Sequence, residues 1–516
     1  MTEPHVIHID SPVDGSRVGE VRCASVEDVR ATVARARVAQ AEWARRPLAE
    51  RCAVLLAIRA RVLARKDEFV ALLARESGKP RHEALMHEVF APLELLTYFA
   101  GEAERILAPT PIPMRLLKHR ASRLHYVPRG VVGIIGPWNF PHNIPFGGAA
   151  MAIVAGNAAV IKPSESTPLI AELALEVWRE AGVPHDLVQL VHGRGDVGAA
   201  LIDAGVDMVE FTGSVATGRK VGAMCGERVI PCVLELGGKA PALVLADADP
   251  GRALHACTWG GYANAGQVCA SIERLLVHDA VAERFVPDFV ERVTALRVGS
   301  AIESADIDVG PLVNRRQLEI VEARVADAVA KGARVLCGGH RVEGMSVGAG
   351  GAGLYYAPTV LDGVTPDMDI VNLETFGPVV PIQRFADEDS MIAEANRSHL
   401  GLLAYVFSRD PERANRVAER IEAGTVMIND VIAAHAMAET PWAGVKQSGI
   451  GSTHGDDALR HMCQQRHINE DVLPWMEREL WWYPYRSKDL PLLERSIRAL
   501  YGSGLWGKVR GLFGNG

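Results

Sequence analysis

Short apolar runs rich in β-prone residues alternate with helical stretches from residue 129 onward. The first four runs are Gly130–Gly136, Ala158–Pro163, Val188–Val191 and Met208–Thr212. Continuous apolar strands joined by helices are typical of a mostly parallel sheet that is covered on both faces. The pattern therefore predicts an α/β fold.

A second block of the same kind extends over residues 238–447. Its clearest strands are Leu243–Leu245, Leu275–Val277 and Val379–Ile382. The glycine-rich stretch Gly338–Gly353 interrupts this block and predicts a surface loop. Because 516 residues are too many for one ordinary core, two or three domains are expected.

The segment before residue 108 predicts helices rather than strands. Apolar residues recur at helical spacing over residues 25–107, and Ser25 is placed to cap the first helix. The prolines of Ala108–Pro113 then prevent a helix from continuing. Arg115–Val127 is expected to be an extended, partly exposed excursion.

Composition excludes several classes of protein. Hydrophobic residues make up 48% of the chain and charged residues 23%, which is typical of a soluble globular protein. The net charge is −8 and the basic residues are scattered, so nucleic-acid binding is not expected. Neither a signal peptide nor a bilayer-spanning apolar run is recognisable. The eight cysteines form no CxxC pair, and we therefore expect a reduced compartment, the cytoplasm.

Two residues offer thiol chemistry. Cys269 lies in the small-residue turn Asn264–Ala270, and Glu235 precedes the glycine pair Gly237–Gly238. A thiol attacks carbonyl carbons well, and a separate carboxylate supplies the base that such chemistry requires. Taken singly, each residue has a structural alternative, an inert buried cysteine and a salt-bridged carboxylate.

Two further segments resemble nucleotide-binding turns. Phe211–Gly218 follows a predicted strand and opens a helix, so that Gly213 would admit a ligand close to the helix N-terminus. Lys162 and Glu165 follow the preceding strand, where Lys would donate to ribose hydroxyls and Glu would repel a 2′-phosphate. These residues predict NAD rather than NADP. The alternatives are a glycine used only for the turn and a solvated Lys-Pro turn.

Asn139 lies between two prolines in Pro137–Pro141, which would hold its amide as a fixed donor to an oxyanion. The alternative is an asparagine that satisfies its own turn. His142, His435 and His454 show no metal-ligand spacing, so no metal is expected.

Seven short motifs follow one another along the chain. They are Pro137–Pro141, Lys162–Glu165, Phe211–Ser214, Glu235–Lys239, Gly266–Cys269, Glu374–Pro378 and Gly444–Gly449. Together they resemble the NAD(P)-dependent aldehyde dehydrogenase superfamily over residues 8–470. The resemblance implies a Rossmann-type NAD-binding domain of residues 1–109 and 130–237, an α/β catalytic domain of residues 238–447, and a β oligomerisation arm of residues 110–129 and 448–471.

The resemblance also implies roles. Cys269 is the expected nucleophile, Glu235 the general base, and Asn139 with the backbone N–H of Cys269 the oxyanion hole. The implied cofactor contacts are Trp138, Lys162, Glu165, Gly213, Ser214, Glu374 and Phe376. The implied reaction oxidises an aldehyde to the acid through a cysteine thiohemiacetal and a thioester.

The sequence departs from the family where Pro441–Gly444 reads Pro-Trp-Ala-Gly instead of Pro-Phe-Gly-Gly. The preceding loop, Val431–Thr440, contains no Arg or Lys to hold a carboxylate, while Ile432, Met437 and Trp442 are apolar. We therefore expect an apolar aliphatic or aromatic aldehyde, with a succinate-semialdehyde-type dehydrogenase as the alternative. The presence of Glu235 favours hydrolysis of the thioester over transfer to coenzyme A.

Residues 472–516 form an aromatic and basic C-terminal extension. After residue 485 it has six Lys or Arg against two acidic residues. Its aromatic residues are Trp475, Trp481, Trp482, Tyr483 and Tyr485, and its apolar residues at helical spacing are Leu493, Ile497, Leu500, Tyr501, Leu505, Val509, Leu512 and Phe513. Packing against protein is the favoured interpretation, and peripheral contact with an anionic membrane is the alternative. The extended arm predicts a homodimer or homotetramer.

Two other classes of function compete with aldehyde oxidation. Cys269 could serve a non-redox thiol esterase or acyltransferase, and the aromatic extension could belong to a binding or membrane-scaffold protein. The combination of Cys269, Glu235 and Asn139 argues against the second class.

Overall fold

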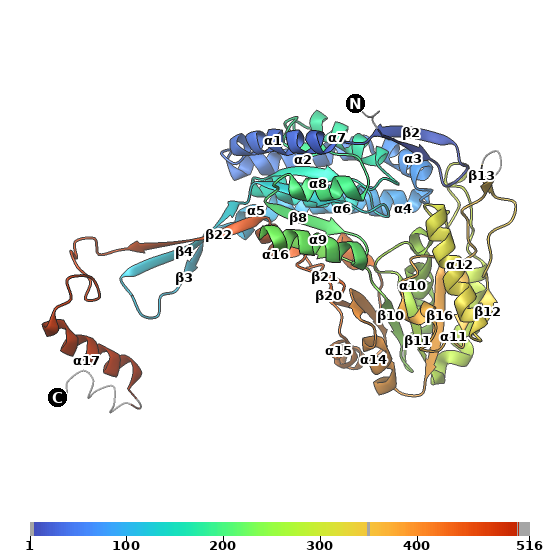
Figure 1. Ribbon diagram of the computed structural model, residues 1–516. Coiled ribbons are helices and arrows are strands. Elements are labelled where there is room, and N and C mark those ends of the chain that lie inside the picture. Colours follow the sequence, from blue (N-terminus) through green and yellow to red (C-terminus); the bar gives the residue numbers. More distant parts are fainter. Residues whose placement is uncertain (1–4, 348–350, 503, 505–516) are drawn as a thin grey trace. The chain divides into compact units, whose positions relative to one another are not determined.

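A computed structural model describes residues 5–347, 351–502 and 504. The chain divides into two compact units, the first of Met1–Ala108 and Tyr126–Gln464 and the second of Pro109–His125 and Gln465–Gly516. The first unit contains two large sheets, each with its own hydrophobic core. Figure 1 shows these elements in sequence colours.

Helices occupy the N-terminal segment, as predicted. They are α1 (Val26–Trp43), α2 (Leu48–Ala64), α3 (Lys66–Glu76), α4 (Arg81–Leu85), the π-helical turn η1 (Met86–Phe90) and α5 (Ala91–Ile106). Ser25 caps α1 and forms a capping box with Asp28, which confirms the predicted start of this helix. The hairpin of β1 (Val6–Asp10) and β2 (Arg17–Arg22) precedes them.

The first large sheet has the strand order β21-β9-β8-β5-β6-β7. Its strands are β5 (Val131–Ile135), β6 (Ala158–Lys162), β7 (Val188–Leu190), β8 (Met208–Thr212), β9 (Cys232–Glu235) and β21 (Gly449–Ile450). All neighbours are parallel except β21, which runs antiparallel to β9. Every residue of β5 and β6 is buried, so both faces of the sheet are covered.

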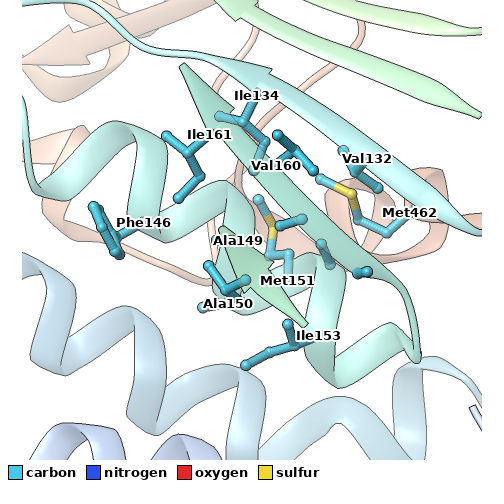
Figure 2. Close-up of a cluster of buried hydrophobic side chains, with 14 of the residues drawn as sticks. Val132, Ile134, Phe146, Ala149, Ala150, Met151, Ile153, Val160, Ile161 and Met462 are labelled. Carbon is cyan, nitrogen blue, oxygen red and sulfur yellow. The ribbon is translucent and has the colours of Figure 1, made fainter. Parts of the chain in front are cut away.

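Four helices connect these strands: α6 (Asn143–Ala155), α7 (Leu169–Glu180), α8 (Gly195–Asp203) and α9 (Val215–Arg228). Helix α6 is buried almost all round, because it packs between β5 and β6 on one side and α2 and α5 on the other. Figure 2 shows its side chains Phe146, Met151 and Ile153 in the core with Val160 and Ile161 of β6.

The second large sheet has the order β12-β15-β16-β11-β10-β18-β19 and is parallel except for β12. Its strands are β10 (Ala240–Val244), β11 (Ile272–His278), β12 (Arg334–Cys337), β15 (Thr359–Asp362), β16 (Val379–Phe385), β18 (Leu403–Phe407) and β19 (Thr425–Ile428). The helices packed around it are α10 (Pro250–Tyr262), α11 (Asp279–Thr294), α12 (Arg315–Ala330), α13 (Asp369–Asn372), α14 (Glu388–Asn396) and α15 (Pro411–Ala418). The predicted α/β class is therefore confirmed in both blocks.

Short elements complete the first unit. The predicted loop at Gly338–Gly353 contains a small antiparallel pair, β13 (Ser346–Val347) with β14 (Gly351–Ala352), and its residues 348–350 lie outside the described part of the chain. A second small pair joins β17 (Leu400–Gly401) to β20 (Val445–Lys446).

The second unit holds most of a three-stranded antiparallel sheet of order β22-β4-β3. Its strands are β3 (Thr110–Ile112), β4 (Arg120–Pro128) and β22 (Cys463–Asp471). The predicted extended excursion is present, although its long strand begins only at Arg120. The expected arm of residues 448–471 differs at its start, because β21 and α16 (Gly455–His461) belong to the first unit, where α16 packs on α5 and α6.

The C-terminal extension contains the turn η4 (Ser487–Asp489) and helix α17 (Leu490–Tyr501). No residue of α17 is buried, and Ile497, Leu500 and Tyr501 are exposed on it. The predicted residues Leu505, Val509, Leu512 and Phe513 lie outside the described residues. In the part of the chain that the structure describes, no helix has the length and apolar content to cross a bilayer.

Candidate active site

The turn that carries Cys269 is tightly constrained. It leads from the 3₁₀ turn η2 (Ala263–Gly266) to β11, and Asn264 and Ala265 both have positive φ. Gly266 also has positive φ, and a Cβ there would lie 2.1 Å from the carbonyl oxygen of Gly377. Only glycine fits this position, so the Cys269 turn and the Phe376–Gly377 turn are packed against each other.

The glycine pair that follows β9, the strand that ends at Glu235, lies against the Cys269 turn. A Cβ at Gly238 would lie 2.1 Å from the carbonyl oxygen of Cys269, and one at Gly237 would lie 2.6 Å from a carboxylate oxygen of Glu374. The absence of side chains at both positions therefore lets the end of the first sheet approach the Cys269 turn and Glu374 closely.

Cys269 and Glu235 line one cavity. The other described residues of its wall are Leu95, Asn143, Ile144, Gly147, Gly148, Met151, Glu210, Thr212, Leu236, Leu402, His435, Trp442, Thr453 and His454. The wall thus combines residues of the first sheet and of α6 with Cys269 and Leu402, which lie just before strands of the second sheet. The sequence motifs that contain Cys269 and Glu235, distant in the chain, converge as predicted.

Burial dominates the protonation of these groups. It raises the pKa of Cys269 to about 12, and the charges of Glu235 and Glu374 act in the same direction. Burial and the charge of Glu210 also raise the pKa of Glu235 well above its ordinary value, while the indole of Trp442 opposes this shift. Neither carboxylate oxygen of Glu235 has a hydrogen-bond partner among the described residues. The thiol of Cys269 is therefore neutral at pH 7.

A third acid shares the cavity. Glu210 is buried in β8, its Oε2 has no hydrogen-bond partner in the described part of the chain, and burial raises its pKa to about 8. The sequence signal for this residue was present, because an acid inside a continuous apolar strand requires an explanation.

Asn139 lies buried beside the nucleophile turn. Its side-chain Nδ2 donates to the carbonyl oxygen of Gln267 at 3.1 Å, two residues before Cys269. The carbonyl oxygen of Asn139 accepts from Lys79 Nζ at 2.7 Å and from Asn264 Nδ2 at 3.3 Å. Asn139 therefore does not merely satisfy its own turn, because its amide contacts the segment that carries the thiol.

A fully buried ion pair supports the Asn139 loop. Lys79 Nζ donates to Glu88 Oε1 at 2.5 Å, and both side chains are 0% exposed. Glu88 Oε2 also accepts from the backbone N–H groups of His142 and Asn143 at 3.1 and 2.9 Å. Sequence analysis missed this pair because both residues lie in the helical segment before residue 108, without any motif.

The expected cofactor residues near the first sheet lie at the carboxyl ends of β6 and β8. Lys162 is buried, donates to the carbonyl oxygen of Pro163 at 2.9 Å and pairs with Glu165 at 3.6 Å. Gly213 follows β8, and Ser214 caps α9 by accepting from the N–H of Thr217. Helix α9 has no acidic residue in its first turn, so its N-terminus is compatible with a pyrophosphate.

Glu374, Phe376 and Trp138 form the other part of the expected cofactor site. Glu374 accepts from the backbone N–H of Gly238 at 3.0 Å, and burial raises its pKa to about 8. The rings of Phe376 and Trp138 meet edge to face, with centroids 5.3 Å apart. Glu273 was missed by sequence analysis and holds this turn, because it accepts from the N–H groups of Thr375 and Phe376. A ribose acceptor and an aromatic surface are thus both in place, which fits a dinucleotide.

Neutral histidines form part of the cavity wall. His435 packs edge to face against Trp442 and His454, and burial lowers the pKa of His435 to about 4. His454 also has a pKa well below its ordinary value. Ile432 and Met437 are not among the lining residues, whereas Trp442 is.

Among the described residues, one group of three side chains has metal-ligand geometry, and it lies in the second unit. It consists of His119, Asp471 and Glu479. Arg120 pairs with both carboxylates, at 3.3 and 2.9 Å, and supplies a positive charge there. This cluster is therefore explained as an ion-pair network. The expectation that the active site uses no metal stays a prediction.

Comparisons with known proteins agree with this geometry. A model of the aldehyde dehydrogenase family matches residues 2–468. A 4,4'-diapolycopene aldehyde oxidase of Methylomonas sp. is 35% identical over 95% of this chain and 91% of that protein. A putative NADP-dependent succinate-semialdehyde dehydrogenase of Mycolicibacterium smegmatis is 36% identical over 89% and 88%. The crystal structure of an NAD-dependent aldehyde dehydrogenase from Sinorhizobium meliloti has a TM-score of 0.87 at 36% identity and covers 93% of each chain.

Proposed function

This chain belongs to the aldehyde dehydrogenase family, and we propose that it couples oxidation of an apolar aldehyde to reduction of NAD, releasing the carboxylic acid. The observation that carries the proposal is the common cavity of Cys269 and Glu235, next to the turn that holds Glu374. The roles of the individual residues follow from this arrangement.

Cys269 adds its sulfur to the aldehyde carbon. Because burial raises the pKa of the thiol to about 12, a base has to remove its proton. Glu235 lines the same cavity, and its raised pKa brings the proton affinity of its carboxylate closer to that of the thiolate. Proton transfer from Cys269 to Glu235 is therefore less uphill than transfer to an ordinary carboxylate.

The oxyanion that forms on addition needs fixed hydrogen-bond donors. The backbone N–H groups of Cys269 and Ala270 lower the pKa of the sulfur, which supports their role as donors next to the reacting carbon. Asn139 Nδ2 uses one N–H for Gln267, and its second N–H is the proposed donor. The nicotinamide cofactor supplies a hydride acceptor when it is bound.

Hydrolysis of the thioester completes the reaction. Glu235 takes a proton from water, the water oxygen bonds to the acyl carbon, the carbon–sulfur bond breaks, and the thiolate of Cys269 leaves. Among the described residues no hydrogen bond of ordinary length occupies the carboxylate oxygens of Glu235, and the nearby indole of Trp442 favours the ionised form; both features suit this role.

The decisive experiment measures NADH formation with aldehyde in the wild type and in Cys269→Ala. We expect the variant to lose activity by about 10⁴-fold or more, since the nucleophile is removed. Cys337→Ala is the matched control, because Cys337 lies on β12, is not among the residues of the cavity wall and should leave the rate unchanged. Thioester hydrolysis by a wild type that forms no NADH with any aldehyde would instead support the non-redox thiol esterase or acyltransferase.

The proposed substrate class follows from the cavity wall. Its described residues include no Arg or Lys that would pair with a substrate carboxylate, whereas Leu95, Ile144, Met151 and Trp442 are apolar. Two of the relatives above are named for a diapolycopene aldehyde and for succinate semialdehyde, so both classes occur among similar proteins. We expect a higher kcat/KM for hexanal or benzaldehyde than for succinate semialdehyde, and the reverse order would overturn this assignment.

We propose NAD as the preferred cofactor because of Glu165. Its carboxylate lies 3.6 Å from Lys162 Nζ, so it neutralises the cation that would otherwise attract a 2′-phosphate. Measuring kcat/KM with both cofactors tests this preference. A value for NADP equal to or above that for NAD would contradict it.

We further propose that the protein is a homo-oligomer and that the extension packs on protein. Trp475, Tyr483 and Tyr485 are more than two-thirds exposed in the single chain, and α17 has no buried residue. Light scattering should give a dimer or tetramer. Co-sedimentation of the full chain, but not of a 1–470 truncation, with anionic liposomes would favour the membrane alternative.

A further inference from the structure

The cavity contains an acid that the proposed mechanism does not use. Glu210 lies on β8, where its neighbours Val209 and Phe211 are buried core residues. Its Oε2 is fully enclosed and without a hydrogen-bond partner in the described part of the chain. An unpaired buried carboxyl group costs several kcal/mol, so its retention needs a reason.

Strand register directs Glu210 toward Glu235. Glu235 pairs with Thr212 across the parallel strands β8 and β9, and Glu210 stands two residues before Thr212. Paired residues and residues two positions apart share one face of a sheet. Glu210 and Glu235 therefore project from the same face, and both line the cavity with Cys269.

Helix α6 leaves room for the second acid. A Cβ at Gly148 would lie 2.5 and 2.6 Å from the two carboxylate oxygens of Glu210. Any other residue at position 148 would push the carboxylate away. The glycine in the middle of α6 is thus the feature that admits Glu210 to the cavity.

We propose that Glu210 is a proton relay for Glu235: it receives the proton that Glu235 removes from the hydrolytic water. This inference rests on the proposed aldehyde oxidation. The O–H bond of Glu235 breaks, an O–H bond forms on the carboxylate of Glu210, and Glu210 later loses the proton to solvent. Glu235 returns to the carboxylate for the next turnover, and Glu210 acts through Glu235 without touching the reacting carbon.

The charges in the cavity are consistent with one shared proton. Among the described residues, the other titratable groups of the wall are Glu235, Cys269, His435 and His454. The two histidines have lowered pKa values and are neutral, so they provide no positive charge to hold two carboxylates. Two acids in one apolar cavity do not ionise together, and the pair exchanges a single proton.

The test separates formation of the thioester from its hydrolysis. Single-turnover measurements follow NADH formation optically and acid release by rapid quench, in the wild type and in Glu210→Gln. We expect NADH formation to change less than about threefold and acid release to slow by roughly 10²-fold, the usual contribution of a proton-transfer group. KM should stay unchanged. The rise of the wild-type hydrolysis rate with pH through about 8, the pKa of Glu210, should disappear in the variant.

Gly148→Ala is the second variant. Alanine is favoured over glycine inside a helix, so folding should be preserved, but its Cβ would displace the Glu210 carboxylate. We expect the same slow acid release, and the double variant should be no slower than either single one. Glu210→Asp, which keeps the acid, should restore part of the rate.

Acid release at the wild-type rate in Glu210→Gln would overturn the relay, because an isosteric neutral amide preserves a purely structural role. Equal slowing of NADH formation and acid release would overturn it as well. A wild type that forms no NADH with any aldehyde would instead contradict the proposed oxidation, and the relay with it.

Discussion

Two groups of buried carboxylates in the first unit differ in their hydrogen-bond partners. Behind the Asn139 loop, Glu88 is bound by Lys79 and by two backbone N–H groups. Under the turn of Glu374, Glu273 is bound in the same manner by Lys239 and two N–H groups. In the cavity, Glu235 has no hydrogen-bond partner for either carboxylate oxygen among the described residues, and Glu210 has none for Oε2.

This difference in hydrogen bonding distinguishes acids that hold loops in place from acids that take part in the proposed chemistry. A carboxylate with a full set of donors is held in one position, which suits a residue that fixes loops. A carboxyl group without donors has a raised pKa and exchanges protons readily, which suits a general base. Glu210 and Glu235 thus lack hydrogen-bond donors in the cavity where the proposed mechanism transfers protons.

The largest expected effect comes from the unpaired acid closest to the proposed chemistry. Glu235→Gln should lower steady-state turnover by about 10²–10⁴-fold, since the amide accepts no proton from water. NADH formation in the first turnover should fall less than acid release. Rapid-quench kinetics measure both, and an unchanged rate of acid release would remove Glu235 from the role of base.

Removing the charge of a paired acid should lower the free energy of unfolding. Glu88→Gln leaves the ammonium of Lys79 buried without its counter-charge, and we expect a loss of about 3–5 kcal/mol in the free energy of unfolding. Urea denaturation measures this loss. The double variant Lys79→Met/Glu88→Met removes both charges and should recover part of it. If Glu88→Gln unfolds at the wild-type midpoint, the pair does not support the loop.

Glu210→Gln should raise the free energy of unfolding at pH 8, whereas Glu88→Gln should lower it. The pKa of Glu210 is raised from 4.5 to about 8 in the folded protein, so the folded state binds more protons than the unfolded state between these values. Stability therefore falls as pH rises through this window, by up to a few kcal/mol from this one group. The variant lacks this loss and should be more stable than the wild type at pH 8 but not at pH 4.5. Thermal unfolding at several pH values tests the sign.

The smallest effect is expected at an exposed pair. Glu165 is about two-fifths exposed and lies 3.6 Å from Lys162. It therefore belongs neither to the fully bound buried acids nor to the unpaired buried acids. Glu165→Gln should raise the ratio of kcat/KM for NADP over NAD by roughly tenfold, about 1.4 kcal/mol, by removing a charge near the expected 2′-position. Ser166→Ala, one residue further on, is the control. An unchanged ratio would show that Glu165 does not select the cofactor.

Sequence patterns located the strands of the first sheet well. The runs at residues 131–135, 158–162 and 208–212 are strands because continuous apolar residues satisfy a sheet that is buried on both faces. Cys269 and Glu235 were singled out by the glycine-containing turns next to them. The structure explains one of these glycines, because Gly238 lies so close to Cys269 that a side chain would not fit.

Supporting residues could not be found in this way. Lys79 lies in the short connection between α3 and α4, and Glu88 lies in η1. Neither belongs to a recognisable motif, and their importance comes from contacts with a loop more than fifty residues away along the chain. The pairing of β21 with β9 could not be found in this way either, because it joins segments that are distant in sequence.

The sequence by itself determined the α/β architecture, because local periodicity encodes it, and it singled out Cys269 and Glu235 as candidates through the family resemblance of their motifs. The tertiary structure alone decided which acids are paired and which are not. Whether a buried carboxyl group finds donors depends on residues brought together from separate elements, as Glu210 shows: β8 supplies the acid, β9 the base, and α6 the space at Gly148.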